Sequence, residues 1–96
     1  MARVVWTHPA AKALEAIEDY IAKDNPQSAF EVAQRIRRAT ELLAEHPKLG
    51  RAGRVRGTLE LIIAGLPYIV PYRIKGDAIE ILTVYHAARK WPESFE

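Results

Sequence analysis

The sequence contains no cysteine and no long apolar run, and each absence excludes a class of protein. Without cysteine, neither a disulfide nor a thiolate metal site can hold the fold together. No run of about 18 apolar residues occurs, so no segment is expected to span a membrane. Residues 1–9 also lack the charged and then apolar layout of a signal peptide. We therefore expect a cytoplasmic protein.

The composition is that of an ordinary folded domain. The chain has 96 residues, of which 49% are hydrophobic and 27% charged, and this balance argues against disorder. We expect a single domain over residues 1–96. The net charge of +2 permits contact with nucleic acid but does not require it. The charge is unevenly distributed, because residues 48–57 contain only basic charges whereas Glu15, Glu18 and Asp19 cluster early in the chain.

A short strand and two helices are predicted for the first half. Residues 3–6 are apolar and β-branched, which favours a strand. Thr7 or His8 can cap a first helix, and Asn25 followed by proline can cap a second. Apolar residues then recur three or four apart in both segments, with Phe30 in the expected stripe of the second. Very few residues join the helices, so we expect an antiparallel hairpin.

Three strands are predicted for the second half. Residues 58–64 alternate in polarity, and residues 68–75 and 78–86 flank Gly76-Asp77, a two-residue hairpin signal. The order is strand, helix, helix and three strands. The expected fold class is α+β, with an antiparallel four-stranded sheet packed against the two-helix hairpin.

The hairpin turn fixes a register that can be checked. It places Arg73 opposite Glu80, Tyr68 opposite Tyr85, and Pro67 opposite His86. Pro71 cannot donate to a ladder, so we expect a bulge or an unpaired edge near it. The face expected to pack on the helices comprises Val70, Tyr72, Ile74, Ile79 and Ile81. The other face is expected to carry an apolar patch for a partner, formed by Ile69, Pro71, Leu82 and Val84 with His86 at its end.

Three segments resemble a known family. They are Leu59-Glu60-Leu61, Tyr72-Arg73-Ile74 and the run from Ile81 to Arg89, and they are similar to the RelE/ParE superfamily of type II toxins. The resemblance covers about Val4 to Pro92. It implies a toxin that a cognate antitoxin neutralises by wrapping around it, in a toxin–antitoxin hetero-oligomer. It also implies one of two targets: RelE-like toxins cleave ribosome-bound messenger RNA without a metal, and ParE-like toxins poison DNA gyrase.

Metal-free RNA cleavage needs groups that move protons and cations that stabilise the phosphate. His86 is the best candidate for acid or base, because imidazole changes charge near neutral pH. Tyr85 is a second candidate, although the predicted register directs it into the core. Arg73 is a candidate phosphate ligand, with a cross-strand ion pair to Glu80 as the alternative. We expect no metal and no cofactor.

The basic segment between Pro47 and Gly57 is the candidate contact for nucleic acid or for an acidic antitoxin segment. Three glycines suggest a flexible loop, and a solvated charge run is the alternative interpretation. Near the C-terminus, Trp91 and Pro92 are expected to anchor the tail. The contact residues are Lys48, Arg51, Arg54, Arg56 and Arg89.

One departure from the nuclease pattern divides the functional hypotheses. RelE-like nucleases commonly carry an arginine early in the strand before the Tyr-Arg pair, and here that run is Ile69-Val70-Pro71-Tyr72. The inventory of His86, Tyr85 and arginines favours a ribosome-dependent endoribonuclease by a narrow margin. A non-enzymatic gyrase inhibitor is the alternative. A third hypothesis is an inactive relative that only binds its antitoxin.

Overall fold

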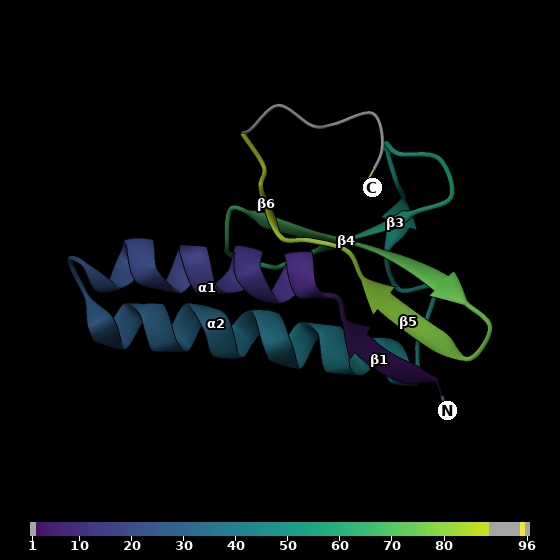
Figure 1. Cartoon of the computed structure of the whole chain (residues 1–96), viewed down its shortest axis with the longest axis horizontal. Coiled ribbons are helices and arrows are strands. Elements are labelled where there is room, and N and C mark those ends of the chain that lie inside the picture. Colours follow the sequence, from purple (N-terminus) through teal and green to yellow (C-terminus); the bar gives the residue numbers. More distant parts are fainter. Residues whose placement is uncertain (1, 89–94, 96) are drawn as a thin grey trace.

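The computed structural model describes residues 2–88 and 95. A two-helix hairpin lies along one face of a twisted sheet and extends past its edge (Figure 1). The helices are α1 (His8–Ala22), α2 (Pro26–Glu41) and the short 3-10 helix η1 (Leu42–Ala44). The strands are β1 (Arg3–Trp6), β2 (Arg51–Ala52), β3 (Leu59–Ile62), β4 (Tyr68–Lys75), β5 (Ala78–Ile81) and β6 (Tyr85–His86). The predicted α+β class is confirmed.

Side-chain caps start both helices, as the sequence predicted. The Thr7 hydroxyl accepts a hydrogen bond from the backbone N–H of Ala10, and the Asn25 side chain accepts one from Ser28. These caps satisfy N–H groups that have no partner within the helix. Thr7 also donates to the carbonyl of Ile81 at 2.6 Å, so the cap of α1 is tied to the sheet.

The sheet is mixed, which corrects the prediction of four antiparallel strands. In the described part of the chain six strands pair, in the order β1-β5-β4-β3-β2, with β6 paired to β4 beyond β5. β1 runs parallel to β5, with Val4 opposite Ile79. Parallel pairing needs a long connection, which the hairpin and the later strands supply. A strand shows the same alternation of polar and apolar residues whether it pairs in parallel or antiparallel. The sequence pattern of β1 therefore did not reveal its parallel pairing with β5.

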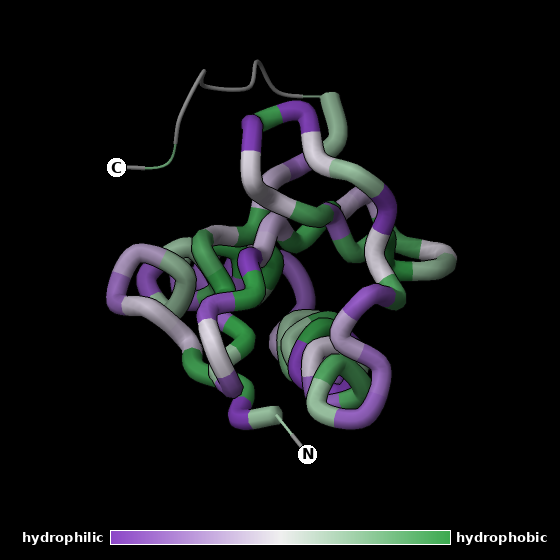
Figure 2. The backbone as a smooth tube through the Cα atoms, turned by 90° about the vertical axis from the view of Figure 1, so that its right-hand side faces the viewer, coloured by the Kyte–Doolittle hydropathy of each residue, from purple (hydrophilic) through white to green (hydrophobic). Residues whose placement is uncertain are grey.

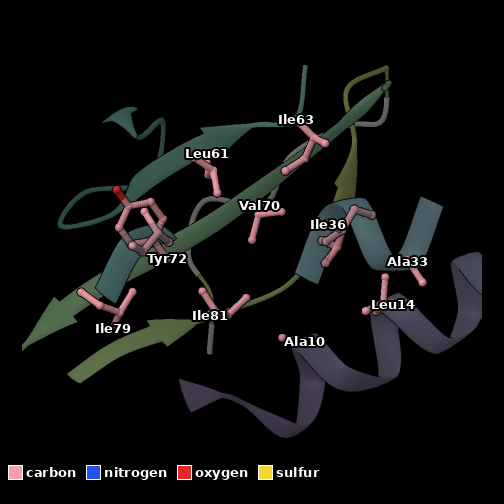
Figure 3. Packing of buried hydrophobic residues seen from close by; sticks show 12 residues of the cluster. Ala10, Leu14, Ala33, Ile36, Leu61, Ile63, Val70, Tyr72, Ile79 and Ile81 are labelled. Carbon is pink, nitrogen blue, oxygen red and sulfur yellow. The ribbon is translucent and has the colours of Figure 1, made fainter. Parts of the chain in front are cut away.

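The core lies between the sheet and the helical hairpin. Side chains from the strands and from both helices point toward one another (Figure 3). The helix axes point at the viewer in Figure 2, and hydrophobic and hydrophilic residues alternate around the helical turns. The helices contribute Ala10, Leu14, Ala33, Ile36 and the strands Leu61, Val70, Tyr72, Ile79 and Ile81, together with Ile63.

Two expected core residues are exposed. Phe30 was placed in the buried stripe of the second helix together with Ala33, but 60% of its surface is exposed, and the neighbouring Ala29 is buried instead. Ile74 shares the helix-facing side of β4 but is 38% exposed. It lies next to the β4–β5 turn, where the hairpin of strands projects beyond the helices (Figure 1).

A bulge between β5 and β6 changes the faces of the last strand. Tyr72 pairs with Ile81 as predicted, but Ile69 pairs with Tyr85 and Tyr68 with His86. Residues 70–71 of β4 therefore lie opposite three residues, 82–84, and the register shifts by one. The bulge near Pro71 is thus confirmed, whereas the predicted pairs of Tyr85 with Tyr68 and of His86 with Pro67 are wrong.

The shift exchanges the predicted positions of several side chains. Residues directly opposite in an antiparallel pair share a face. His86 therefore shares the helix-facing side with Tyr68, and Val84 joins the core at 5% exposure. Tyr85 lies on the second face beside Ile69. The apolar patch expected on that face is not exposed, because Ile69 is only 5% exposed and Pro71 is buried.

Candidate functional site

The basic segment between Pro47 and Gly57 is held in place by a buried tyrosine. The Tyr72 hydroxyl donates to the Pro47 carbonyl at 2.7 Å and accepts from the Gly50 N–H at 2.9 Å. A side chain at Gly50 would lie 2.7 Å from the Tyr72 ring, so only glycine allows this approach. Burial raises the pKa of Tyr72, and the hydrogen bond from Gly50 partly opposes that shift. The glycine expected to give flexibility therefore permits close packing within the protein.

A buried carboxylate holds the next part of the segment. Glu60 is 1% exposed, and its Oε1 accepts hydrogen bonds from Nε and Nη2 of Arg51 at 3.2 and 3.0 Å. Its Oε2 accepts from the backbone N–H of Arg54 at 2.8 Å, and the Arg54 guanidinium lies 3.7 Å away. A buried charge is tolerated when it is paired in this way. Glu60 thus joins two of the predicted contact residues.

The far end of the segment closes in a compact turn. The Gly53 N–H donates to the Thr58 carbonyl at 2.9 Å, and the Thr58 hydroxyl donates to the Val55 carbonyl at 2.6 Å. Val55 is itself buried. These bonds contradict the expectation of a loosely solvated loop, because its backbone is fixed at both ends.

The remaining predicted contact residues differ in position. Lys48 and Arg56 are exposed on the same segment. Arg89 lies outside the described residues, as do Trp91 and Pro92. Sequence reasoning missed Glu60, because alternation in β3 placed it opposite Leu59 and Leu61 on the solvent side. The sequence gives no pattern that marks this residue as buried.

The three predicted catalytic residues do not meet. His86 pairs with Tyr68, their rings 5.7 Å apart edge to face, and its Nδ1 accepts a hydrogen bond from the Ala88 N–H. Tyr85 lies on the opposite face, with its ring 5.9 Å from that of Phe95. The contacts of His86 within residues 2–88 thus include an aromatic ring and a backbone N–H. Its surroundings are those of a packed strand end.

Arg73 is engaged in the cross-strand pair that the sequence predicted. Its Nε lies 2.5 Å from Oε1 of Glu80, and this hydrogen bond holds the pKa of Glu80 below its ordinary value. Along β4, Tyr68 and Arg73 are separated by roughly 16 Å at about 3.3 Å per residue, and they point to opposite faces. Arg73 and His86 therefore cannot contact the same phosphate.

A second charged feature lies beside β1, at the opposite edge of the sheet from β2. A groove of about 680 Å³ is lined by apolar residues of β1 and the helices, including Trp6 and Leu14. Its acidic residues are Glu15, Glu18, Asp19 and Glu41, and Arg37 pairs with Glu18 at 3.3 Å. The sequence indicated the early acidic cluster. It did not indicate that this cluster borders a groove beside the open edge of β1.

The described residues form neither a metal centre nor a membrane-spanning helix. Across residues 2–88 and 95, no group of three or more His, Asp or Glu side chains is placed to hold a metal ion. Within the same described part of the chain, no helix has both the length and the apolar character needed to cross a bilayer.

Comparison with known proteins identifies the family. Residues 4–91 match the family described as the ParE toxin of the type II toxin–antitoxin system parDE. The chain is 50% identical to the putative toxin Y4kP of Sinorhizobium fredii over 91 residues, covering 95% of this chain and 94% of that protein. It is 38% identical to Toxin RelE2 of Caulobacter vibrioides over 89 residues, covering 93% and 99%.

A solved structure agrees in fold. A chain of the chromosomal ParDE toxin–antitoxin system from P. aeruginosa superposes with a TM-score of 0.80 at 31% identity, covering 90% of this chain and 96% of that one. The fold, the family match and the relatives agree over nearly the whole chain. The protein belongs to the ParE toxin family of type II toxin–antitoxin systems.

Proposed function

We propose that this toxin acts by binding its target, DNA gyrase, and not by cleaving RNA. As a member of a type II toxin family, it has an antitoxin as its partner. The proposal concerns what the free toxin does. It reverses the narrow preference for a nuclease that the residue inventory alone gave.

One observation carries the proposal, namely that the predicted catalytic residues are dispersed. Cleavage needs a proton-transfer group and a cation around one phosphate. His86 and Arg73 point to opposite faces of the sheet, and Arg73 already forms an ion pair with Glu80. The absence of an arginine in residues 69–72 removes another phosphate ligand of the nuclease pattern. Inhibition by surface contact requires none of these groups to converge.

The ribosome-dependent endoribonuclease remains the second candidate function. Similarity to a toxin named RelE2 favours it, as does the placement of His86 beside Tyr68 at a strand end. His86, Tyr85 and Arg73 are the residues that this alternative would use.

Two assays on purified, antitoxin-free toxin separate the candidates. One measures supercoiling by gyrase, and the other measures messenger RNA cleavage in a reconstituted translation reaction. We expect blocked supercoiling, intact message, and the same result for His86→Ala. The matched control is His8→Ala, which removes an exposed imidazole at the start of α1. RNA cleavage that is lost in His86→Ala but retained in His8→Ala would overturn the proposal.

A further inference from the structure

The basic segment contains a buried acid at its centre. Both carboxylate oxygens of Glu60 accept hydrogen bonds, from the Arg51 guanidinium and from the Arg54 backbone. Glu60 itself is 1% exposed, so it cannot contact a partner directly. Any influence of Glu60 on recognition must therefore act through the two arginines.

The side chains of Arg51 and Arg54 remain exposed to solvent, although Glu60 holds the Arg51 guanidinium and the Arg54 backbone in place. The side chain of Arg51 is 54% exposed and that of Arg54 is 44% exposed. Arg51 uses two of its nitrogens on Glu60, and a guanidinium carries five N–H donors in a rigid fork. An arginine held in this way loses less conformational entropy when it meets a second acceptor.

The charge balance indicates which kind of acceptor this arrangement suits. Lys48, Arg51, Arg54 and Arg56 contribute four positive charges and Glu60 removes one, which leaves three. Affinity for nucleic acid rises with the number of cations on the backbone, so a buried acid works against it. A fixed guanidinium fork can pair with a carboxylate or with a phosphate, so its direction alone does not choose between them. The reduced positive charge favours an acidic protein segment.

We propose that Glu60 is a positioning residue, which holds Arg51 and Arg54 as a preformed receptor for an acidic segment of the antitoxin. The inference rests on the toxin–antitoxin assignment and is independent of whether gyrase is the target. A result against it leaves the gyrase assays untouched, and the reverse also holds.

Glu60→Gln distinguishes positioning from simple attraction, because the two predict opposite signs. The substitution removes the negative charge and raises the net charge of the segment from three to four. If charge alone mattered, the antitoxin would bind more tightly. If Glu60 positions the arginines, we expect the dissociation constant for purified cognate antitoxin to rise about tenfold. The control is Glu45→Gln, which makes the same charge change at an exposed residue before the segment and is expected to leave affinity unchanged.

A double-mutant cycle tests whether Glu60 acts through Arg51. Arg51→Lys keeps the charge but loses the fork, and we expect about a tenfold loss of affinity. The double variant should lose about as much as either single variant, because both break one unit. A general loss of stability would make the two losses multiply, and that result would overturn the proposal. Arg38→Lys is the matched control at an exposed arginine of α2 and should change affinity little.

Two further results would also refute the inference. The first is that Glu60→Gln binds the antitoxin as tightly as the unmodified protein, or more tightly. The second is that the variants spare antitoxin binding and weaken binding to a short DNA duplex, which would assign the segment to nucleic acid. If Glu60→Gln fails to fold, Arg51→Lys against Arg38→Lys still decides, because an equal effect at both positions contradicts a fixed fork.

Discussion

Tyr72→Phe is the sharpest test of how the basic segment is held. The substitution removes one oxygen atom and keeps the buried ring. That oxygen makes two hydrogen bonds, to the Pro47 carbonyl at 2.7 Å and from the Gly50 N–H at 2.9 Å. The residue has no exposed surface, so the change acts on packing and hydrogen bonding alone.

The magnitude follows from counting those bonds. Each intramolecular hydrogen bond contributes about 1 kcal/mol net, so the loss of two should lower the free energy of unfolding by about 2 kcal/mol. Pro47 and Gly50 are half-buried, and water can replace part of what they lose, which keeps the effect from being larger. For a domain of this size, 2 kcal/mol corresponds to a fall in Tm of roughly 10 °C.

Urea unfolding followed by circular dichroism measures this loss. We expect a lower midpoint at an unchanged slope, because the surface exposed on unfolding stays the same. The matched control is Tyr20→Phe, which removes the same atom from a residue that is 73% exposed. That variant should stay within about 0.5 kcal/mol of the unmodified protein.

The pH dependence supplies a second readout. Burial raises the pKa of Tyr72 in the folded state, so the folded protein retains this proton at a pH where the unfolded chain has lost it. Stability from this residue is complete below the unfolded pKa of about 10 and is lost as pH rises above it. The difference in free energy of unfolding between the unmodified protein and Tyr72→Phe should therefore become smaller above pH ~10. An equal midpoint for both proteins at pH 7 would refute the argument that Tyr72 anchors the segment.

Two further substitutions test other parts of the structure. Gly53→Ala would place a methyl group 2.7 Å from the backbone oxygen of Thr58, so we expect a loss of about 1–3 kcal/mol in thermal unfolding, and an unchanged Tm would contradict the compact turn. Glu80→Gln tests the ion pair with Arg73, whose hydrogen bond lowers the pKa of Glu80. The stabilising effect of this ion pair is present above the pKa of Glu80 in the unfolded chain and is lost as pH falls through its lower pKa in the folded protein. The variant should therefore be less stable than the unmodified protein at pH 7, and the difference in their free energies of unfolding should disappear in acid. A gap that stays constant from pH 7 to pH 3 would show that the pair contributes nothing through ionisation.

Local chemistry made much of the fold predictable. Thr7 and Asn25 cap helices because their side chains satisfy free N–H groups, and Gly76 adopts φ +62° in the two-residue turn. The turn then fixed the pairing of Arg73 with Glu80, because register near a tight hairpin follows directly from turn length. These features depend on residues that are close together in the chain, so they can be read directly from the sequence.

Features set by distant contacts were harder to predict. The direction of β1 depends on where the chain returns after the helices, and its apolar alternation is the same for either direction. Phe30 lies outside the core because the buried face of α2 passes through Ala29 and Ala33. In each case tertiary packing decided between positions that local pattern left equivalent.

The candidate site shows the same division. The basic residues were recognisable as a group from composition, and four of them lie on one described segment. Their spatial organisation was not recognisable from composition. It depends on Glu60 in β3 and Tyr72 in β4, which reach the segment only after the sheet has formed. A polar residue in an alternating strand looks exposed until the segment that covers it is known.

The bulge between β5 and β6 makes chain length a determinant of what the last strand displays. Because side chains alternate with a period of two, one residue more or fewer in 82–84 exchanges the faces of everything that follows. A single deletion there would return Tyr85 to the helix side and turn His86 outward with no change in either amino acid. In this fold, an insertion or deletion of one codon can therefore redefine a surface that point substitutions leave in place.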